Sequence, residues 1–297
     1  MSNLIAAPAL RERLGDAGLR IVDVRFDLTD PEAGRGAYLR GHVPGAVHLD
    51  LEKDLSGPVA ADRTGGRHPL PDPDGFARRL AHLGIGEEHD VVAYDDAGGA
   101  MAARAWWLLR WIGHRRVRVL DGGVAAWVAA GGALSDDEVA WPAAEHRAHV
   151  DPPQTIDADE LLRRRDDPSL RLLDARAPER YRGETEPLDP VAGHVPGAWN
   201  RPFAENLRGG RIRPVAEVRE RLAGATGHGE VAVYCGSGVT AAHLALALEE
   251  VGLGMPRLYA GSWSDWTSCG DRPVATGDAE TGSEATTEAH RAHGSTG

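Results

Sequence analysis

A cysteine in a glycine-rich loop is the residue best suited to do chemistry in this chain of 297 residues. Cys235 follows the apolar run Glu230–Tyr234 and precedes the helical pattern Thr240–Val251. A loop between a parallel strand and a helix lies at the carboxyl edge of the sheet, where backbone N–H groups and the helix dipole attract an anion. We therefore expect Cys235 to be a thiolate nucleophile rather than an inert core cysteine.

The residues that follow Cys235 suit a loop that curls around a sulfur atom. Glycine adopts backbone conformations closed to other residues and lets the main chain approach closely. The predicted binding loop consists of Gly236, Ser237, Gly238, Val239 and Thr240.

The second cysteine, Cys269, stands in Ser-Cys-Gly-Asp with no helix after it, and we expect it to be an incidental turn residue. Two cysteines argue against a disulfide scaffold or a thiolate metal site. We expect no metal, no organic cofactor and a reducing, cytoplasmic setting.

An internal repeat explains how the rest of the chain is organised. Gly41–Ala46 returns unchanged as Gly193–Ala198, and Leu19–Arg25 returns in similar form as Leu170–Arg176. The offset, about 140 to 150 residues, is that of a domain duplication rather than a solenoid. In each copy, short apolar runs alternate with helical patterns, which predicts an α/β fold with a parallel sheet flanked by helices.

The composition sets the expected domain boundaries. We predict a first domain over residues 1–134, a linker rich in Asp, Glu, Pro and Ala over 135–155, and a second domain over 156–275. Residues 276–297 contain no large apolar side chain, so we expect a disordered tail. The net charge of −12 disfavours nucleic-acid binding, and no apolar stretch is long enough to cross a membrane.

One copy of the repeat serves as a control for the other. His42 and His194 occupy the same position in both copies, so we expect both to be structural. The position of Cys235 is taken in the first copy by Asp95, an anion that cannot act as this nucleophile. We therefore expect the first domain to be catalytically silent.

From about Leu4 to Ala275, these motifs resemble the two-domain rhodanese family of sulfurtransferases. The resemblance rests on the repeated Gly-His-Val-Pro-Gly-Ala, on Asp121-Gly-Gly with a following tryptophan, and on the loop that begins at Cys235. It implies two tandem rhodanese-like domains, of which the first is inactive. It also implies a persulfide on the cysteine that passes sulfur to cyanide, a thiol or a thioredoxin-like protein.

The loop is most similar to that of 3-mercaptopyruvate sulfurtransferases, since it lacks the two basic residues usual in thiosulfate-specific members. That resemblance implies that Arg180 binds the donor's carboxylate and that Ser237 joins His68 and Glu52. The family's second arginine has no match where Thr185–Pro190 stands. This departure leaves thiosulfate open as the donor, and Arg182 is an alternative second cation.

Two other functions compete with sulfur transfer. Cysteine phosphatases need an arginine six positions after the cysteine to hold phosphoryl oxygens, and Ala241 stands there, which disfavours that class. A non-enzymatic persulfide carrier or interaction module would use the same loop and remains an alternative.

Overall fold

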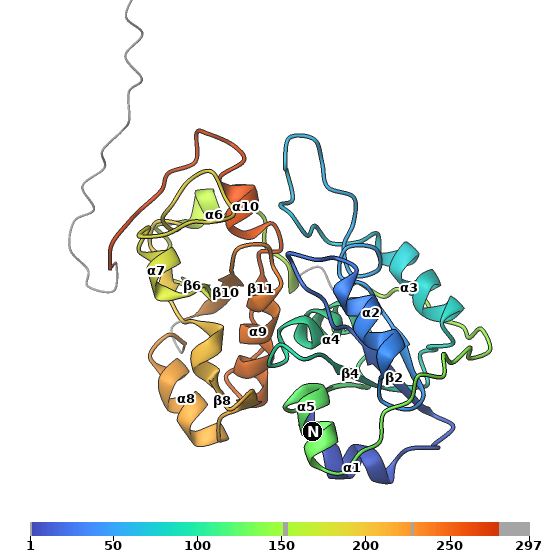
Figure 1. The fold of residues 1–297 in the computed structure, drawn as a ribbon. Coiled ribbons are helices and arrows are strands. Elements are labelled where there is room, and N and C mark those ends of the chain that lie inside the picture. The colour runs from blue at the N-terminus through green and yellow to red at the C-terminus, as the bar shows by residue number, and fades with distance from the viewer. Residues whose placement is uncertain (1, 151–153, 227–228, 279–297) are drawn as a thin grey trace, which may run out of the picture.

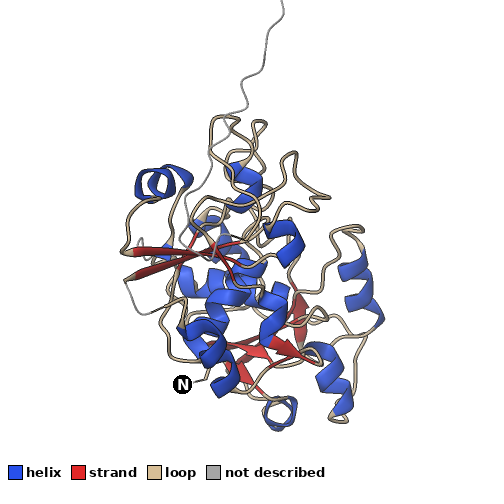
Figure 2. Cartoon of the chain, turned by 90° about the vertical axis from the view of Figure 1, so that its left-hand side faces the viewer, coloured by secondary structure: helices blue, strands red, loops and turns tan. Residues whose placement is uncertain are grey.

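The chain is described by a computed structural model over residues 2–150, 154–226 and 229–278. Two α/β domains lie side by side, the first coloured blue to green and the second yellow to red in Figure 1. Helices flank the strands of each domain (Figure 2), as the alternating sequence pattern predicts. None of the helices in this described part of the chain is long and apolar enough to span a bilayer.

The first domain contains a five-stranded parallel sheet with the strand order β1-β5-β4-β2-β3. Its central strands are almost wholly buried, which is why they read as continuous apolar runs. The strands are β1 (Leu4–Ile5), β2 (Leu19–Asp23), β3 (Ala46–His48), β4 (Asp90–Tyr94) and β5 (Val117–Leu120). The helices are α1 (Ala7–Glu12), α2 (Ala33–Arg40), α3 (Pro73–His82), α4 (Ala100–Trp111) and α5 (Gly123–Ala129).

The second domain repeats this plan with a four-stranded parallel sheet ordered β11-β10-β6-β7. The strands are β6 (Leu170–Asp174), β7 (Trp199–Asn200), β10 (Glu230–Tyr234) and β11 (Arg257–Leu258). A short antiparallel pair, β8 (Leu207–Arg208) with β9 (Arg211–Ile212), lies outside this sheet. The helices are α6 (Ala158–Arg164), α7 (Pro178–Tyr181), the 3-10 helix η2 (Phe203–Asn206), α8 (Val215–Ala223), α9 (Thr240–Glu250) and α10 (Ser262–Trp266). Both sheets confirm the α/β class expected from the sequence.

The repeated histidines have the same contacts in both domains. The Nδ1 atom of His42 lies 2.8 Å from the carbonyl oxygen of Tyr38, and Nδ1 of His194 lies 2.8 Å from that of Tyr181. Each imidazole also stacks on that tyrosine ring, with centroids 4.0 and 3.8 Å apart. These matched contacts are structural, as the comparison of the two copies predicts.

Helix α3 begins at an aspartate cap. The Asp72 carboxylate accepts a hydrogen bond of 2.7 Å from the backbone N–H of Gly75. Pro73 takes the first helical position, because proline has no N–H and its fixed φ favours that position.

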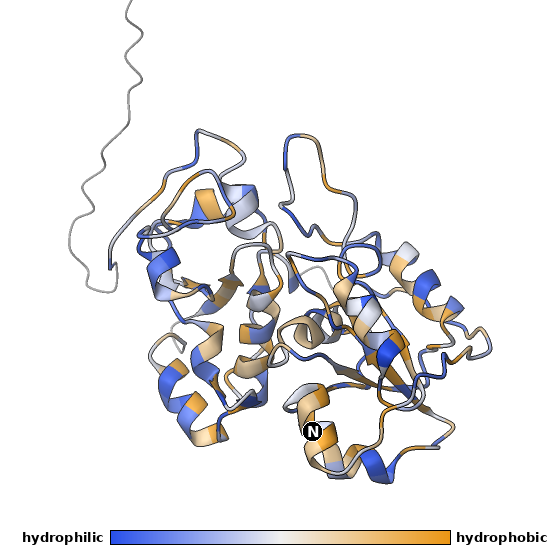
Figure 3. Ribbon diagram, in the orientation of Figure 1, coloured by the Kyte–Doolittle hydropathy of each residue, from blue (hydrophilic) through white to orange (hydrophobic). Residues whose placement is uncertain are grey.

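Helices α4 and α9 pack against each other between the domains (Figure 1). A single cluster of buried apolar side chains runs through this contact and includes Trp106 and Leu109 of α4 with Leu244 and Leu248 of α9. The hydrophobic colouring of Figure 3 follows the strands and these helices. The domains therefore share one core, which fixes the first domain against the loop that precedes α9.

Of the segment predicted as a linker, residues 135–155, the described residues 135–150 contact the first domain. Ser135 pairs with His42, and the indole of Trp141 donates to the carbonyl oxygen of Gly45 at 3.3 Å. Thr155 then pairs with Leu258 at the edge of the second sheet. Of the predicted tail, residues 279–297 lie outside the described part of the chain.

Candidate active site

Cys235 directly follows β10 and is buried, with 2% of its surface exposed. Its sulfur accepts a hydrogen bond from the backbone N–H of Gly238 at 3.1 Å. Gly238 has a φ of +77°, and a Cβ there would stand 2.4 Å from the carbonyl oxygen of Ala260. The tight curl of the loop around the sulfur therefore requires glycine at this position.

The first turn of α10 fixes the same loop from its other side. The Ser262 hydroxyl accepts a hydrogen bond from the backbone N–H of Cys235 at 3.1 Å. The backbone N–H groups of Trp263 and Ser264 donate to the carbonyl oxygens of Cys235 and Gly236, each at 3.0 Å. These bonds hold the main chain of Cys235 and Gly236 in one conformation.

The equivalent loop of the first domain shows what such a loop binds. Asp95 follows β4, is fully buried, and accepts hydrogen bonds from four backbone N–H groups at 2.8–2.9 Å. The donors are Ala97, Gly99, Met101 and Ala102. Burial raises the pKa of Asp95, while these N–H bonds favour its ionised form. The repeated loop is thus a cradle for an anion, and in the first domain the chain fills it with its own carboxylate.

A buried arginine joins the Cys235 loop to the first domain. Arg104 of α4 donates to the carbonyl oxygens of Gly238 at 3.2 Å and His68 at 3.0 Å. Burial lowers the pKa of Arg104 to about 10, and a negative charge on Cys235 would act in the opposite direction. The predicted anion site consisted of main-chain amides and a helix dipole, and the structure places a buried guanidinium against the same loop.

His68 and Ser237 meet across the domain boundary. The Nδ1 atom of His68 lies 2.9 Å from the Ser237 hydroxyl oxygen, and both side chains are buried. Burial, together with the charges of Arg104 and Arg67, lowers the pKa of His68 to about 3. The imidazole is therefore neutral at physiological pH and exchanges a hydrogen bond with the hydroxyl next to the nucleophile.

Arg180 of α7 also reaches the loop. Its Nη1 atom lies 3.4 Å from the position that a Cβ on Gly236 would occupy, one residue from the nucleophile. The guanidinium is already paired with Glu186, with 2.6 Å between Arg180 Nη2 and Glu186 Oε1. Val239 and Thr240 complete the loop and start α9.

Two further predicted residues are not brought to this cluster. The Glu52 side chain is exposed, and the described contacts join it to neither His68 nor Ser237. Arg182 pairs instead with Glu184, at 2.7 Å between Nε and Oε1. The triad inferred from the resemblance is thus assembled only as a His68–Ser237 pair.

Sequence reasoning missed Arg104 and Arg67. A signal for Arg104 existed, because it interrupts an apolar helical run, and a buried helix holds a charge only where the charge finds partners. Nothing in the sequence marks Arg67 as a site residue, since it stands in a loop of the first domain, far from Cys235 along the chain.

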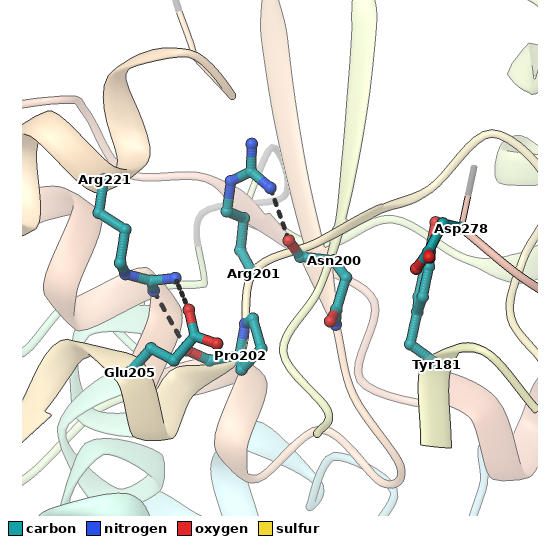
Figure 4. A pocket seen from close by; sticks show the side chains of 7 residues that line it. All are labelled: Tyr181, Asn200, Arg201, Pro202, Glu205, Arg221 and Asp278. Carbon is teal, nitrogen blue, oxygen red and sulfur yellow. Dashed lines mark hydrogen bonds and ion pairs between the residues drawn. The ribbon is translucent and has the colours of Figure 1, made fainter. Parts of the chain in front are cut away.

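A surface cavity of about 310 Å³ lies elsewhere on the second domain (Figure 4). It is lined by Tyr181, Asn200, Arg201, Pro202, Glu205, Arg221 and Asp278. Arg221 donates to Glu205 across its wall, at 3.0 Å. Neither Cys235 nor its loop borders this cavity, so the cavity is separate from the candidate active site.

Comparison with known protein families matches the rhodanese-like domain twice, over residues 6–130 and 157–269. Each match covers one of the two α/β domains, apart from β1 at the start of the first, and together they cover most of the chain. The chain therefore belongs to the rhodanese family.

Similar proteins have nearly the same length and are called sulfurtransferases, which places the chain among the sulfurtransferase enzymes of this family. A probable 3-mercaptopyruvate sulfurtransferase of Pseudomonas aeruginosa is 48% identical over 283 residues, which cover 93% of this chain and 99% of that protein. A putative thiosulfate sulfurtransferase of Mycobacterium tuberculosis is 41% identical, with coverage of 87% of this chain and 91% of that protein.

Solved structures agree on the fold. The structure of SseA from Escherichia coli, described as a 3-mercaptopyruvate sulfotransferase, superposes with a TM-score of 0.79 at 32% identity and covers 89% of this chain and 100% of that one. A complex of the enzyme EanB with ergothioneine has a TM-score of 0.80 at 22% identity, covering 93% of this chain and 70% of that one, and shares the fold alone.

Proposed function

We propose that this chain transfers a sulfane sulfur from a small donor, through a persulfide on Cys235, to cyanide or a thiol acceptor. The observation that carries the proposal is the equivalence of Cys235 and Asp95. The same loop holds a carboxylate with four N–H donors in the first domain and a thiol in the second. A site built for an anion suits both a thiolate and the charged outer sulfur of a persulfide.

The first half-reaction loads the cysteine. The Cys235 thiolate attacks the sulfur of 3-mercaptopyruvate, an S–S bond forms, and the carbon–sulfur bond breaks with its electron pair passing to pyruvate enolate. With thiosulfate the leaving group is sulfite. The loop amides from Gly236 to Thr240 then surround the persulfide. In this proposal the Ser237 hydroxyl, which contacts neutral His68, donates a hydrogen bond to the departing enolate oxygen.

The second half-reaction removes the sulfur from Cys235. Cyanide, a small thiol or a reduced thioredoxin-like protein attacks the outer sulfur, the S–S bond breaks, and its electrons return to Cys235 as a thiolate. Neither step needs a metal or an organic cofactor. Both cysteines are unpaired, which supports a reducing, cytoplasmic setting.

Names of relatives support two donors, since one is called a 3-mercaptopyruvate and another a thiosulfate sulfurtransferase. We favour the keto acid. The loop from Gly236 to Thr240 carries no cation, and Arg180 can pair with a carboxylate through two parallel hydrogen bonds.

Steady-state assays test the enzymatic proposal directly. We expect many thiocyanate molecules per enzyme from mercaptopyruvate and cyanide, and a strong loss with Arg180→Ala for the keto acid. A persulfide carrier, the alternative function, would load Cys235 once and show no repeated turnover with small-molecule donor and acceptor.

A further inference from the structure

A second guanidinium approaches the nucleophile from the first domain. Arg67 Nη2 lies 3.2 Å from the position of a Cβ on Gly236, closer than either terminal nitrogen of Arg180 at 3.4 and 3.5 Å. The two cations therefore converge on the residue next to Cys235. Each side chain is only 19% exposed.

The loop that carries Arg67 is held in place by α10. The backbone N–H of Arg67 donates to the Ser264 hydroxyl at 3.1 Å, and that of Gly65 donates to Asp265 Oδ1 at 2.9 Å. A Cβ on Gly66 would lie 2.3 Å from the carbonyl oxygen of Gly261, so the main chains of the two domains touch there. Arg67 is thus fixed by the same helix that fixes the main chain of Cys235.

An internal carboxylate lies between the two arginines. Asp189 forms a close ion pair with Arg67, and its Oδ2 atom lies 3.7 Å from Arg180 Nη2. The Asp189 side chain is 4% exposed, and its Oδ2 has no hydrogen-bond partner among the described residues. Glu186 supplies a second carboxylate, 3% exposed, to Arg180. A carboxylate between two guanidinium groups marks a position suited to the anionic end of a ligand.

We propose that Arg67 is the second donor-binding arginine of this enzyme, that it holds the donor's anionic end together with Arg180, and that Asp189 occupies this position until the donor displaces it. The inference rests on the proposed sulfur transfer. It assigns to the first domain the cation that the second domain lacks between Thr185 and Pro190.

This assignment bears on the choice of donor. Arg176 also contacts Glu186 and is paired with Asp174, so the three arginines and the three carboxylates of this cluster sum to no net charge. A donor with one carboxylate can replace Asp189 and leave the balance unchanged, whereas the thiosulfate dianion adds an uncompensated charge in a poorly solvated site. Asp189 is therefore expected to favour the monoanionic keto acid.

Two substitutions with opposite expected effects test this role. Arg67→Gln removes the cation, and we expect kcat/KM for mercaptopyruvate to fall by about 10- to 100-fold. Asp189→Asn removes the competing carboxylate, and we expect kcat/KM for thiosulfate to rise by about 10-fold. Both changes break the same interdomain ion pair. A merely structural pair would make both variants lose activity and thermal stability together, and that result would overturn the proposal.

Alkylation of Cys235 separates this inference from the proposed function. Iodoacetate and iodoacetamide have nearly the same shape, but only iodoacetate carries a carboxylate, and mass spectrometry of the Cys235 peptide avoids interference from Cys269. We expect Arg67→Gln to lower the iodoacetate rate by about 10-fold relative to iodoacetamide, and an unchanged ratio would contradict the role of Arg67. If the ratio falls but no donor loads sulfur onto the wild-type protein, the proposed function fails while the anion site stands.

Discussion

His68 of the first domain and Ser237 of the second lie 2.9 Å apart, from Nδ1 to Oγ, although 169 residues separate them in the chain. The contact forms only when the two domains are packed together. The first domain therefore contributes to the proposed site, since it supplies the partner of a hydroxyl two residues from Cys235.

Removal of the His68–Ser237 hydrogen bond should slow sulfur transfer and leave the fold intact. We expect Ser237→Ala and His68→Asn each to lower kcat with mercaptopyruvate by about 10- to 100-fold, because the proposed transfer uses the Ser237 hydroxyl and His68 orients it. The double variant should be no slower than the slower single variant, since the two groups act as a unit. If the double variant instead lost activity by the product of the two single losses, Ser237 and His68 would act independently. Single-turnover loading of Cys235 provides the measurement.

Arg104 should matter more for stability than any exposed arginine. Arg104→Met leaves the carbonyl oxygens of Gly238, in the Cys235 loop, and of His68, in the first domain, without this donor, and we expect a loss of about 3 kcal/mol in the free energy of unfolding. Arg110→Met is the matched control in the same helix. Arg110 pairs with the partly exposed Glu249 and also contacts the Asn3 side-chain oxygen at 3.4 Å and the Trp106 ring, and its loss should cost about 1 kcal/mol or less. Equal losses in urea unfolding would refute the special role of Arg104.

Asp95→Asn tests the anion cradle without touching the nucleophile. The amide keeps the shape of the side chain but turns an NH₂ group toward backbone N–H donors, which should cost about 2 to 4 kcal/mol in unfolding free energy. Activity per folded molecule should change less than twofold. An unaltered stability would mean that the cradle has no preference for an anion.

Stability should fall as the solution becomes acidic. Burial lowers the pKa of His68 to about 3 and of His114 and His243 to about 4, below the ordinary value of 6.5. The unfolded chain therefore takes up protons first as the pH falls below 6.5. The folded state then loses stability, by about 1.4 kcal/mol per histidine per pH unit, until the pH reaches the folded pKa values.

Urea unfolding at pH 7 and pH 5 provides the measurement for this pH effect. His243→Leu in α9 is the informative variant, because it removes one proton-binding group from the shared core. Its stability should depend less steeply on pH than that of the wild type. A midpoint independent of pH between 7 and 5 would contradict the neutral state of these histidines.

The sequence was sufficient to predict the duplicated α/β fold, because the repeat and the buried parallel strands both leave local patterns. The same holds for the loop at Cys235, whose glycines and position before a helix are visible in one short segment. His68 and Arg67 could not be placed in this way. Their neighbours come from the other domain, so their roles depend on how α4 packs on α9.

The acidic stretch after Arg180 shows a second limit. In the sequence, Glu186 and Asp189 stand where a second arginine was expected, and they read only as a departure from the family pattern. In three dimensions the same residues hold both arginines at the site. The effect of a charge depends on what it faces, and the order of residues along one chain does not contain that information.

Mass spectrometry of the protein after treatment with donor shows whether Cys235 carries the transferred sulfur. We expect that mercaptopyruvate adds the mass of one sulfur atom to Cys235, that cyanide then removes it as thiocyanate, and that Cys235→Ser gains nothing. An unmodified wild-type protein, or thiocyanate formation that survives Cys235→Ser, would contradict this expectation.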